Sequence, residues 1–373
     1  MKLIKGILAA ALAVASFAPA MHAADEPQQP WQLVNALDLR VINKGWDNTL
    51  RPFTRIPAYL EDSVRHDLWE RAQCSTGLGI RFATNSRRIG VKYELLWDTH
   101  LIHMADTGLK GTDLYILEGD SVWRHVNTNR PYVNNKEEKI VESTYVERLD
   151  GKMHEYMIYF PLYDGVNELW VKVDSGAVIT PGNPEIIDVN RKIVAYGTSI
   201  LQGGCASRTG MCGTNIIGRE LNAEVVNIGI SGEGKMDNCM ARAMNQIPDV
   251  DLFLLDPVPN CTEMMCDTLT YDFVKIIAQA HPDTPIVMLA GPLYPYSRYD
   301  SMFQNYLPAK NDAFRRNYQR LKDEGFNNLY FIESEGLDGI EDDGTVDGIH
   351  LTDLGFRHYA DYLLPYLREI LGW

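Results

Sequence analysis

Cysteine is scarce in this chain, and its six cysteines form no CxxC pair among 373 residues. Structural zinc sites are usually built from such pairs together with clustered histidines, and the sequence shows neither pattern. We therefore expect no metal ion and no other cofactor. The glycine-rich stretch at residues 229–234 also lacks the spacing of either phosphate-binding fingerprint.

Basic residues are outnumbered, with 35 Lys and Arg against 50 Asp and Glu, for a formal net charge of −15. Removing residues 1–24 takes away Lys2 and Lys5 and no acidic residue, so the charge becomes −15 − 2 = −17. Such an acidic chain is a poor candidate for binding nucleic acid or an anionic membrane surface.

Long apolar runs are absent beyond the start of the chain, so we expect no membrane span. Residues 1–24 combine two lysines, an apolar core and small residues before Asp25, which is typical of a secretory signal peptide. We expect a periplasmic or secreted protein, in which disulfides can form. The sequence-near candidates are Cys205 with Cys212 and Cys261 with Cys266, although spacing does not determine pairing.

Residues 25–186 are typical of short strands separated by turn residues. The strand-like segments are rich in β-branched and aromatic residues and often alternate with polar ones; they read GLGIRFAT, IGVKYELLW, TDLYILEG, HEYMIYFPLY and ELWVKVD. This pattern predicts an all-β jelly-roll or sandwich domain. Glycine and proline in residues 175–186 indicate a linker.

Residues 187–373 follow a different pattern, in which short apolar runs alternate with helical stretches. The runs are KIVAYG, AEVVNIGI, VDLFLLD, PIVMLAG and LYFIES. Buried strands that alternate with helices predict a parallel sheet covered on both faces, with the site beyond the carboxyl ends of the strands.

Polar residues suited to acyl transfer stand at these predicted strand ends. The first run ends in Gly-Thr-Ser at Ser199, and Asp347 stands three positions before His350 near the end of the chain. A serine nucleophile, a histidine base and a carboxylate that orients the base form a catalytic triad. Taken alone, Ser199 can equally be a helix N-cap, and Asp347 and His350 a solvated pair.

Two further strand ends offer hydrogen-bond donors for a developing oxyanion. Gly232 follows the second run, and Asn260 follows the third. The backbone N–H groups of Ser199 and Gly232 and the side-chain amide of Asn260 are the three predicted donors of an oxyanion hole. Each segment alone is also compatible with an ordinary turn.

The four segments resemble the blocks of the SGNH (GDSL-type) hydrolase family and occur in its order, as GTSI, SGEG, PN and DGIH. The resemblance covers most of residues 190–373 and implies a flavodoxin-like three-layer α/β/α domain that hydrolyses esters without a metal. Two departures stand out. Thr198 replaces the aspartate of Gly-Asp-Ser-Leu, and the block around Asn260 lacks the Gly-x-Asn-Asp form.

Residues 111–115 read GTDLY, which resembles the GxDLY signature of β-rich domains that precede one branch of these esterases. That branch is similar to exported bacterial carbohydrate esterases, so the resemblance implies an acylated oligo- or polysaccharide substrate with acetyl as the acyl group. The alternatives are a lipase or thioesterase for longer chains, a transferase, and an inactive carbohydrate-binding protein. Nothing in the sequence indicates the glycan, the acyl position or the oligomeric state.

Aromatic residues near the predicted site are candidates for contact with substrate. Tyr294 and Tyr296 follow the fourth run and are predicted substrate-binding residues, with loop packing as the alternative. Trp97 and His103, in the β-rich half, are not expected to reach the site.

Overall fold

The computed structural model describes residues 29–119, 121–133, 135–183, 191–337 and 343–373. The predicted signal peptide, residues 1–24, and the predicted domain boundary at 186/187 lie outside these residues. Both therefore remain predictions.

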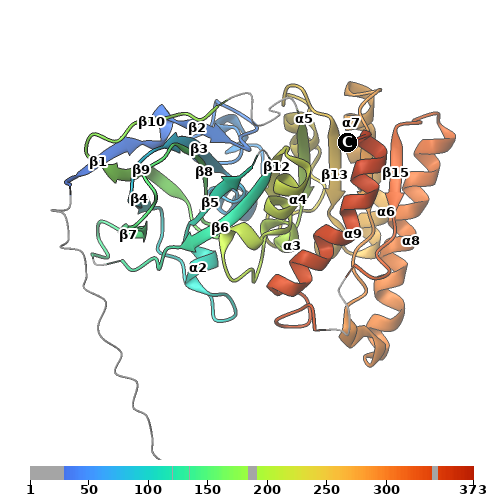
Figure 1. Ribbon diagram of the computed structural model, residues 1–373. Helices are drawn as coiled ribbons and strands as arrows, with labels where there is room; N and C mark the ends of the chain where they lie inside the picture. Colours follow the sequence, from blue (N-terminus) through green and yellow to red (C-terminus); the bar gives the residue numbers. More distant parts are fainter. Residues whose placement is uncertain (1–28, 120, 134, 184–190, 338–342) are drawn as a thin grey trace, which may run out of the picture. The chain divides into compact units, whose positions relative to one another are not determined.

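The first half contains two antiparallel sheets that share one core (Figure 1). One sheet has the order β1-β9-β4-β7, and the other has the order β10-β3-β8-β5-β6 with β2 paired to β3. The strands are β1 (Trp31–Asn35), β2 (Arg40–Ile42), β3 (Gly79–Thr84), β4 (Ile89–Leu95), β5 (Asp113–Glu118), β6 (Val122–Thr128), β7 (Ile140–Val146), β8 (His154–Tyr159), β9 (Val166–Asp174) and β10 (Ile179–Thr180). The predicted sandwich is confirmed.

The five segments predicted as strands are β3, β4, β5, β8 and β9, and the others were not predicted. β6 and β7 were not predicted because most of their residues are exposed or half-buried, which gives them polar sequences. β10 lies inside the predicted linker, where it pairs with β3.

Short helices interrupt this half. They are η1 (Ala36–Asp38), η2 (Ala58–Leu60), α1 (His66–Ala72) and α2 (Asp106–Leu109). Leu68 and Trp69 of α1, with Trp46 and Ile56, pack into the core of the second half rather than between the two antiparallel sheets. Most buried apolar residues from Trp46 to Ala72 therefore belong to the first half in sequence and to the second half in packing, whereas Phe53 packs between the two antiparallel sheets.

The second half is built on a parallel sheet of order β12-β11-β13-β14-β15. Its strands are β11 (Lys192–Gly197), β12 (Glu224–Gly229), β13 (Leu252–Asp256), β14 (Ile286–Leu289) and β15 (Leu329–Ile332). Each predicted apolar run contains one of them. This order, with the first strand between the second and the third, is that of flavodoxin-like folds and confirms the predicted fold class.

Helices cover both faces of this sheet (Figure 1). Val194 and Tyr196 of β11 face a core shared with α5, α7 and α8, and Ile193 and Ala195 face a core shared with α4 and α9. The helices are α3 (Ser199–Gln202), η3 (Thr209–Met211), α4 (Gly213–Leu221), α5 (Asn238–Met244), η4 (Val258–Asn260), α6 (Glu263–Thr268), α7 (Thr270–Ala280), η5 (Pro295–Arg298), α8 (Ser301–Asp323) and α9 (Asp353–Leu371).

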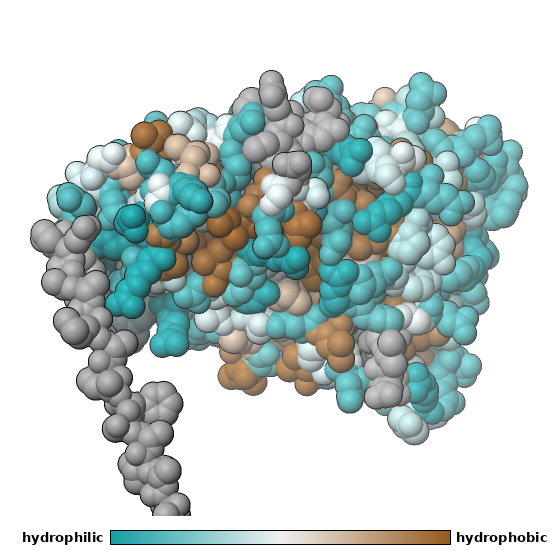
Figure 2. All heavy atoms as spheres, viewed as in Figure 1, coloured by the Kyte–Doolittle hydropathy of each residue, from teal (hydrophilic) through white to brown (hydrophobic). Residues whose placement is uncertain are grey.

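Polar residues cover most of the face in Figure 2. Within the described residues, every helix is too short or too polar to cross a lipid bilayer.

All six cysteines lie in the described part of the chain, and none is in a disulfide. The sequence-near cysteine pairs are thus unbonded in this structure.

Candidate active site

Ser199 stands where β11, which lies between β12 and β13 in the parallel sheet, turns into a helix. β11 ends at Gly197, and Thr198 caps α3, its Oγ1 accepting a hydrogen bond from Ile200 N–H at 3.3 Å. Ser199 is the first helical residue, so the N-cap alternative for Ser199 is wrong and Thr198 takes that role. The Ser199 N–H lies in the first turn, where no intrahelical acceptor exists.

Asp347 and His350 lie in a tight turn before α9. His350 Nε2 is 2.9 Å from Ser199 Oγ, and His350 Nδ1 is 2.8 Å from Asp347 Oδ2. The same carboxylate accepts hydrogen bonds from the N–H groups of Ile349 at 3.0 Å and His350 at 2.8 Å. The structure therefore brings together the three residues predicted as a triad, although Ser199 and His350 are 151 positions apart.

The environment of Asp347 keeps its carboxylate charged. Partial burial acts to raise its pKa, but hydrogen bonds from the His350 ring and from the His350 and Ile349 N–H groups outweigh burial and lower the pKa to about 2. An ionised Asp347 accepts a hydrogen bond from His350 Nδ1–H, which leaves Nε2 unprotonated and able to accept the proton of Ser199.

The glycine-rich loop after β12 lies against the turn that carries Ser199. Ile230 N–H donates to Gly197 O at 3.0 Å. A Cβ on Gly234 would lie 2.1 Å from Gly197 O, so only glycine fits there. Gly232 has φ +73°, a conformation that suits glycine. Gly232 was predicted from the sequence and Gly234 was not, because the need for glycine at position 234 is visible only in the packing.

Asn260 ends η4, after β13, and its side chain reaches the same loop. Its Oδ1 accepts a hydrogen bond from Gly234 N–H at 3.3 Å. Because the oxygen is held in this way, the amide nitrogen is left to donate elsewhere. Ser199, Gly232 and Asn260 thus follow three neighbouring strands at one edge of the sheet.

Two arginines from the first half fix the peptide groups of the glycine-rich loop. Arg71 Nη1 donates to Ser231 O at 2.8 Å. In a trans peptide the following N–H points the opposite way, so Gly232 N–H is directed away from Arg71. Arg55 is buried and donates to Gly229 O at 2.6 Å and to Arg71 O at 3.0 Å.

A third arginine binds the far end of the loop. Arg65 Nη2 donates to Glu233 O at 3.1 Å and is paired with Asp237 at 2.7 Å, and its Nη1 forms an ion pair with the Glu233 carboxylate. The loop that carries Gly232 is therefore held along its length by side chains from residues 55–71, a support that no local pattern in the sequence indicates.

The GTDLY segment holds the loop that follows α3. Asp113 is fully buried and accepts hydrogen bonds from Arg208 Nη1 at 2.6 Å and Gly210 N–H at 2.8 Å. Tyr115 OH accepts a second hydrogen bond from the same Arg208 nitrogen at 2.7 Å. The Asp and Tyr of this segment therefore connect the first half to the loop between α3 and α4.

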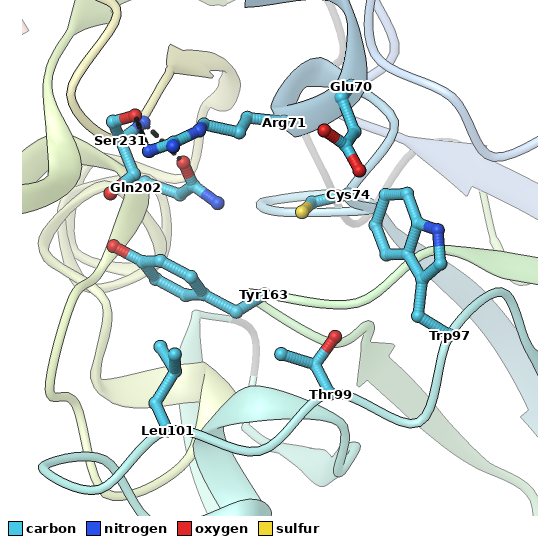
Figure 3. A pocket seen from close by; sticks show the side chains of 9 residues that line it. All are labelled: Glu70, Arg71, Cys74, Trp97, Thr99, Leu101, Tyr163, Gln202 and Ser231. Atoms are coloured by element: carbon cyan, nitrogen blue, oxygen red, sulfur yellow. Dashed lines mark hydrogen bonds between the residues drawn. The ribbon is translucent and has the colours of Figure 1, made fainter. Parts of the chain in front are cut away.

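A pocket of about 400 Å³ opens beside the glycine-rich loop, and most of its wall comes from the first half (Figure 3). It is lined by Glu70, Arg71, Cys74, Trp97, Thr99, Leu101, Tyr163, Gln202 and Ser231. Tyr163, one of the lining residues, donates a hydrogen bond from its OH to the backbone carbonyl of Ser199 at 3.3 Å. Figure 3 shows Trp97 and Tyr163 on different sides of the pocket, with Arg71, Gln202 and Ser231 grouped together.

The predicted substrate-binding tyrosines lie on the Asp347 side of the site. Tyr294 is 6% exposed and stacks on Tyr296, with ring centroids 5.7 Å apart. A Cβ on Gly348, in the turn between Asp347 and His350, would lie 3.2 Å from the Tyr296 ring. Tyr294 thus packs into the core, and Tyr296 packs against the turn.

Trp97 and His103 come closer to the site than the sequence led us to expect. Trp97 lines the pocket beside Ser199, and the His103 ring lies 5.5 Å from that of His350. Both are far from the site in sequence and reach it through the packing of one half on the other, so the expectation that they stay away is wrong.

Comparison with known families agrees with the motifs. A model described as the GDSL-like lipase/acylhydrolase family matches residues 190–368, and the GxDLY model, described as the N-terminus of SGNH-hydrolase-type esterases, matches residues 30–179. The two families suggested by the sequence are thereby confirmed. Among curated protein sequences, none matches the chain.

Solved structures resemble the chain over both halves. A Bacteroides ovatus protein described as a GDSL-like lipase is 31% identical, with a TM-score of 0.85, over 92% of this chain and 98% of that one. A salicylyl-acyltransferase from a tetracycline biosynthetic pathway is 15% identical, with a TM-score of 0.73 over 91% and 97%. A family two carbohydrate esterase from Cellvibrio japonicus is 13% identical, with a TM-score of 0.57 over 92% and 99%. The last two show the fold alone.

Proposed function

The chain belongs to the GDSL-like lipase/acylhydrolase family, and we propose that it is a serine esterase that removes acetyl groups from carbohydrate. The observation that carries the proposal is the hydrogen-bonded series Ser199–His350–Asp347 beyond the end of β11. It provides a nucleophile, a base and a charge that orients the base, which are the groups that acyl transfer requires.

In the proposed reaction, His350 Nε2 takes the proton of Ser199 Oγ as the oxygen attacks the ester carbonyl. The tetrahedral intermediate collapses to an acyl-serine, and His350 gives its proton to the leaving sugar oxygen. Water, deprotonated by His350, then attacks the acyl-serine and releases the acid and free Ser199. Asp347 stays ionised and stabilises the imidazolium in both halves of the reaction.

The oxyanion of each tetrahedral intermediate needs donors that are already in place. We assign this role to the N–H groups of Ser199 and Gly232 and the side-chain amide of Asn260. The assignment is supported by the Arg71 bond that turns Gly232 N–H away from the arginine, and by the Gly234 bond that holds the oxygen of Asn260. Removing one such donor typically costs about 10²–10³ in kcat.

The pocket beside Ser199 favours a carbohydrate over a long acyl chain. Its lining mixes the aromatic residues Trp97 and Tyr163 with the polar side chains of Glu70, Arg71 and Gln202. An aromatic face with several hydrogen-bonding groups suits a sugar ring, whereas a lipase needs an extended apolar cleft. The carbohydrate esterase among the similar structures shares the fold of this chain, which supports a carbohydrate substrate at the level of the fold.

The decisive experiment is acetate release from a panel of acetylated glycans and from nitrophenyl acetate, with wild type and Ser199→Ala side by side. We expect release to depend on Ser199 and to be faster from some glycans than from nitrophenyl esters of longer acids. Release that is equal in both proteins, or absent in wild type, contradicts the proposal. A strong preference for long acyl chains instead supports a lipase or thioesterase.

The pocket assignment has its own test. Trp97→Ala is expected to raise KM for the preferred glycan about tenfold, which is the loss of about 1.4 kcal/mol and corresponds to roughly 55 Å² of apolar surface no longer buried by the sugar, while KM for nitrophenyl acetate stays the same. Trp170→Ala, on β9 and outside the lining of the pocket, is the matched control. Equal changes with both substrates contradict the assignment.

The similar acyltransferase raises a second candidate, in which a second alcohol replaces water in the last step. Turnover that rises when a free sugar is added, with the acyl group found on that sugar, supports a transferase.

We also propose that residues 1–24 direct export. N-terminal sequencing of the protein recovered from outside the cytoplasm tests this, and an intact Met1 there contradicts it.

A further inference from the structure

The proposed base, His350, and two other metal-ligating side chains lie close together. One nitrogen of His103, one nitrogen of His350 and Cys205 Sγ all lie within 4.8 Å of one another. His103 comes from the short turn bounded by Leu101 and Met104 in the first half, and Cys205 comes from the loop after α3. Cys205 is buried, and the two histidines are partly buried.

The chemistry of these donors is specific for a soft metal ion. Two imidazoles and a thiolate are typical ligands of zinc and copper, while magnesium and calcium prefer oxygen. A thioether also lies close to Cys205, because Met104 Sδ accepts a hydrogen bond from Cys205 N–H at 3.4 Å. Around tetrahedral zinc the ligand atoms are about 3.3–3.7 Å apart by the usual bond lengths, so donors that lie within 4.8 Å of one another need to move together by about 1.5 Å at most.

Both nitrogens of His350 are already committed. Nε2 is hydrogen-bonded to Ser199 Oγ, and Nδ1 is hydrogen-bonded to Asp347 Oδ2. A metal bound through Nε2 displaces the serine, and a metal bound through Nδ1 displaces the aspartate. Whichever nitrogen ligates, the metal breaks one of the two hydrogen bonds on which the proposed reaction depends.

We propose that His103, Cys205 and His350 form an inhibitory site for zinc or a similar soft metal ion. Binding releases the proton of the Cys205 thiol to solvent as the metal–sulfur bond forms, and water completes the coordination. The metal is not a cofactor of the reaction but removes the base from it. The inhibition rests on the proposed function, whereas metal binding does not.

Binding is tested on the full protein with Co²⁺, whose thiolate complexes absorb in the near ultraviolet. We expect a thiolate-to-cobalt band that saturates near one equivalent, disappears on adding zinc and is absent in Cys205→Ser. Cys239→Ser, which removes another cysteine, is the matched control and should keep the band. A band that persists in Cys205→Ser overturns the proposal even if the protein proves to have no esterase activity.

Inhibition is tested with nitrophenyl acetate, comparing each variant with its own metal-free rate. Zinc should suppress wild-type turnover, a chelator should restore it, and magnesium or calcium should have no effect. Because loss of even an outer-shell partner costs about 10–100-fold in metal affinity, Cys205→Ser and His103→Ala should each raise the half-inhibiting zinc concentration by at least about tenfold.

A second group of donors provides the matched histidine control. His66, Asp67 and Glu70 are exposed on α1, and their ligand atoms also lie within 4.8 Å of one another. His66→Ala should remain as sensitive to zinc as the wild type. Sensitivity lost in His66→Ala, or retained in both Cys205→Ser and His103→Ala, overturns the assignment.

Discussion

Two segments flank Ser199, and they are held in place in opposite ways. The turn at residues 345–351 supports itself, because Asp347 accepts hydrogen bonds from residues only two and three positions later. The glycine-rich loop at 229–237 is held from outside, by arginines 160–174 positions earlier in the chain. The proposed base thus sits on a local structure, and the proposed oxyanion donor Gly232 depends on the packing of one half on the other.

This difference predicts that substitutions in the two segments affect different quantities, the reaction rate in one and the stability of the fold in the other. The side chains of the turn touch the reacting atoms and are partly exposed, so changing them should alter the rate more than the stability. Arg55 is buried with its nitrogens bound to backbone carbonyls, so changing it should alter stability first.

The largest expected effect is that of His350→Ala. Without the base, kcat with nitrophenyl acetate should fall by about 10⁴–10⁶, while the unfolding midpoint in denaturant stays close to that of wild type. Steady-state kinetics and urea unfolding monitored by tryptophan fluorescence measure the two. A large loss of stability would contradict the view that the turn supports itself.

Arg55→Met tests the loop that is held from outside. The substitution removes the side-chain donor of the buried Cys74 and Gly229 carbonyls, whereas the Arg71 carbonyl keeps a hydrogen bond from Cys74 N–H at 3.3 Å. We expect a loss of about 3 kcal/mol in the free energy of unfolding, since each unsatisfied buried group costs roughly 1–3 kcal/mol. Urea unfolding measures it. Arg124→Met, on the exposed strand β6, is the matched control and should change stability by less than about 0.5 kcal/mol.

These two segments also show what the sequence could reveal. Asp347 and His350 lie within one turn, and Ser199 follows a short apolar run, so local patterns and strand order placed all three. Arg55, Arg71, Trp97 and His103 carry no such pattern. Their positions depend on how the first half packs on the second, which no short-range periodicity encodes.

The fold divides in the same way. The apolar runs predicted the parallel sheet because β11, β12, β13 and β14 are buried on both faces and therefore apolar along almost their whole length, although Tyr330 of β15 is exposed. β6 and β7 present mostly exposed or half-buried residues, and α1 is too short for a helical period. Burial of α1 against the second half, through Leu68 and Trp69, has no signature in its seven residues.

Arg71→Met should have a smaller, mainly kinetic effect. Its bond to Ser231 O orients the peptide that carries Gly232 N–H, and the side chain lies at the edge of the pocket. We expect kcat to fall about tenfold, a fraction of the 10²–10³ lost with a whole oxyanion donor, with under about 1 kcal/mol of stability lost. Arg71→Lys should recover part of kcat. A KM effect alone would show that Arg71 binds substrate and does not position the loop.

The smallest expected effect separates the two segments by pH. The pKa of Asp347 is lowered in the folded protein to about 2, against about 3.9 in an unfolded chain. The folded state therefore binds fewer protons in this interval, so the stabilisation by Asp347 is complete above pH 4 and is lost as the pH falls towards 2. Because the side chain is 36% exposed, screening should keep the contribution below about 1 kcal/mol.

The difference in unfolding free energy between wild type and Asp347→Asn should shrink between pH 5 and pH 2. The corresponding difference for Arg71→Met should stay constant, because the carbonyl that Arg71 binds does not titrate. A difference for Asp347→Asn that holds steady to pH 2 would mean that the turn owes its shape to the backbone and not to the carboxylate.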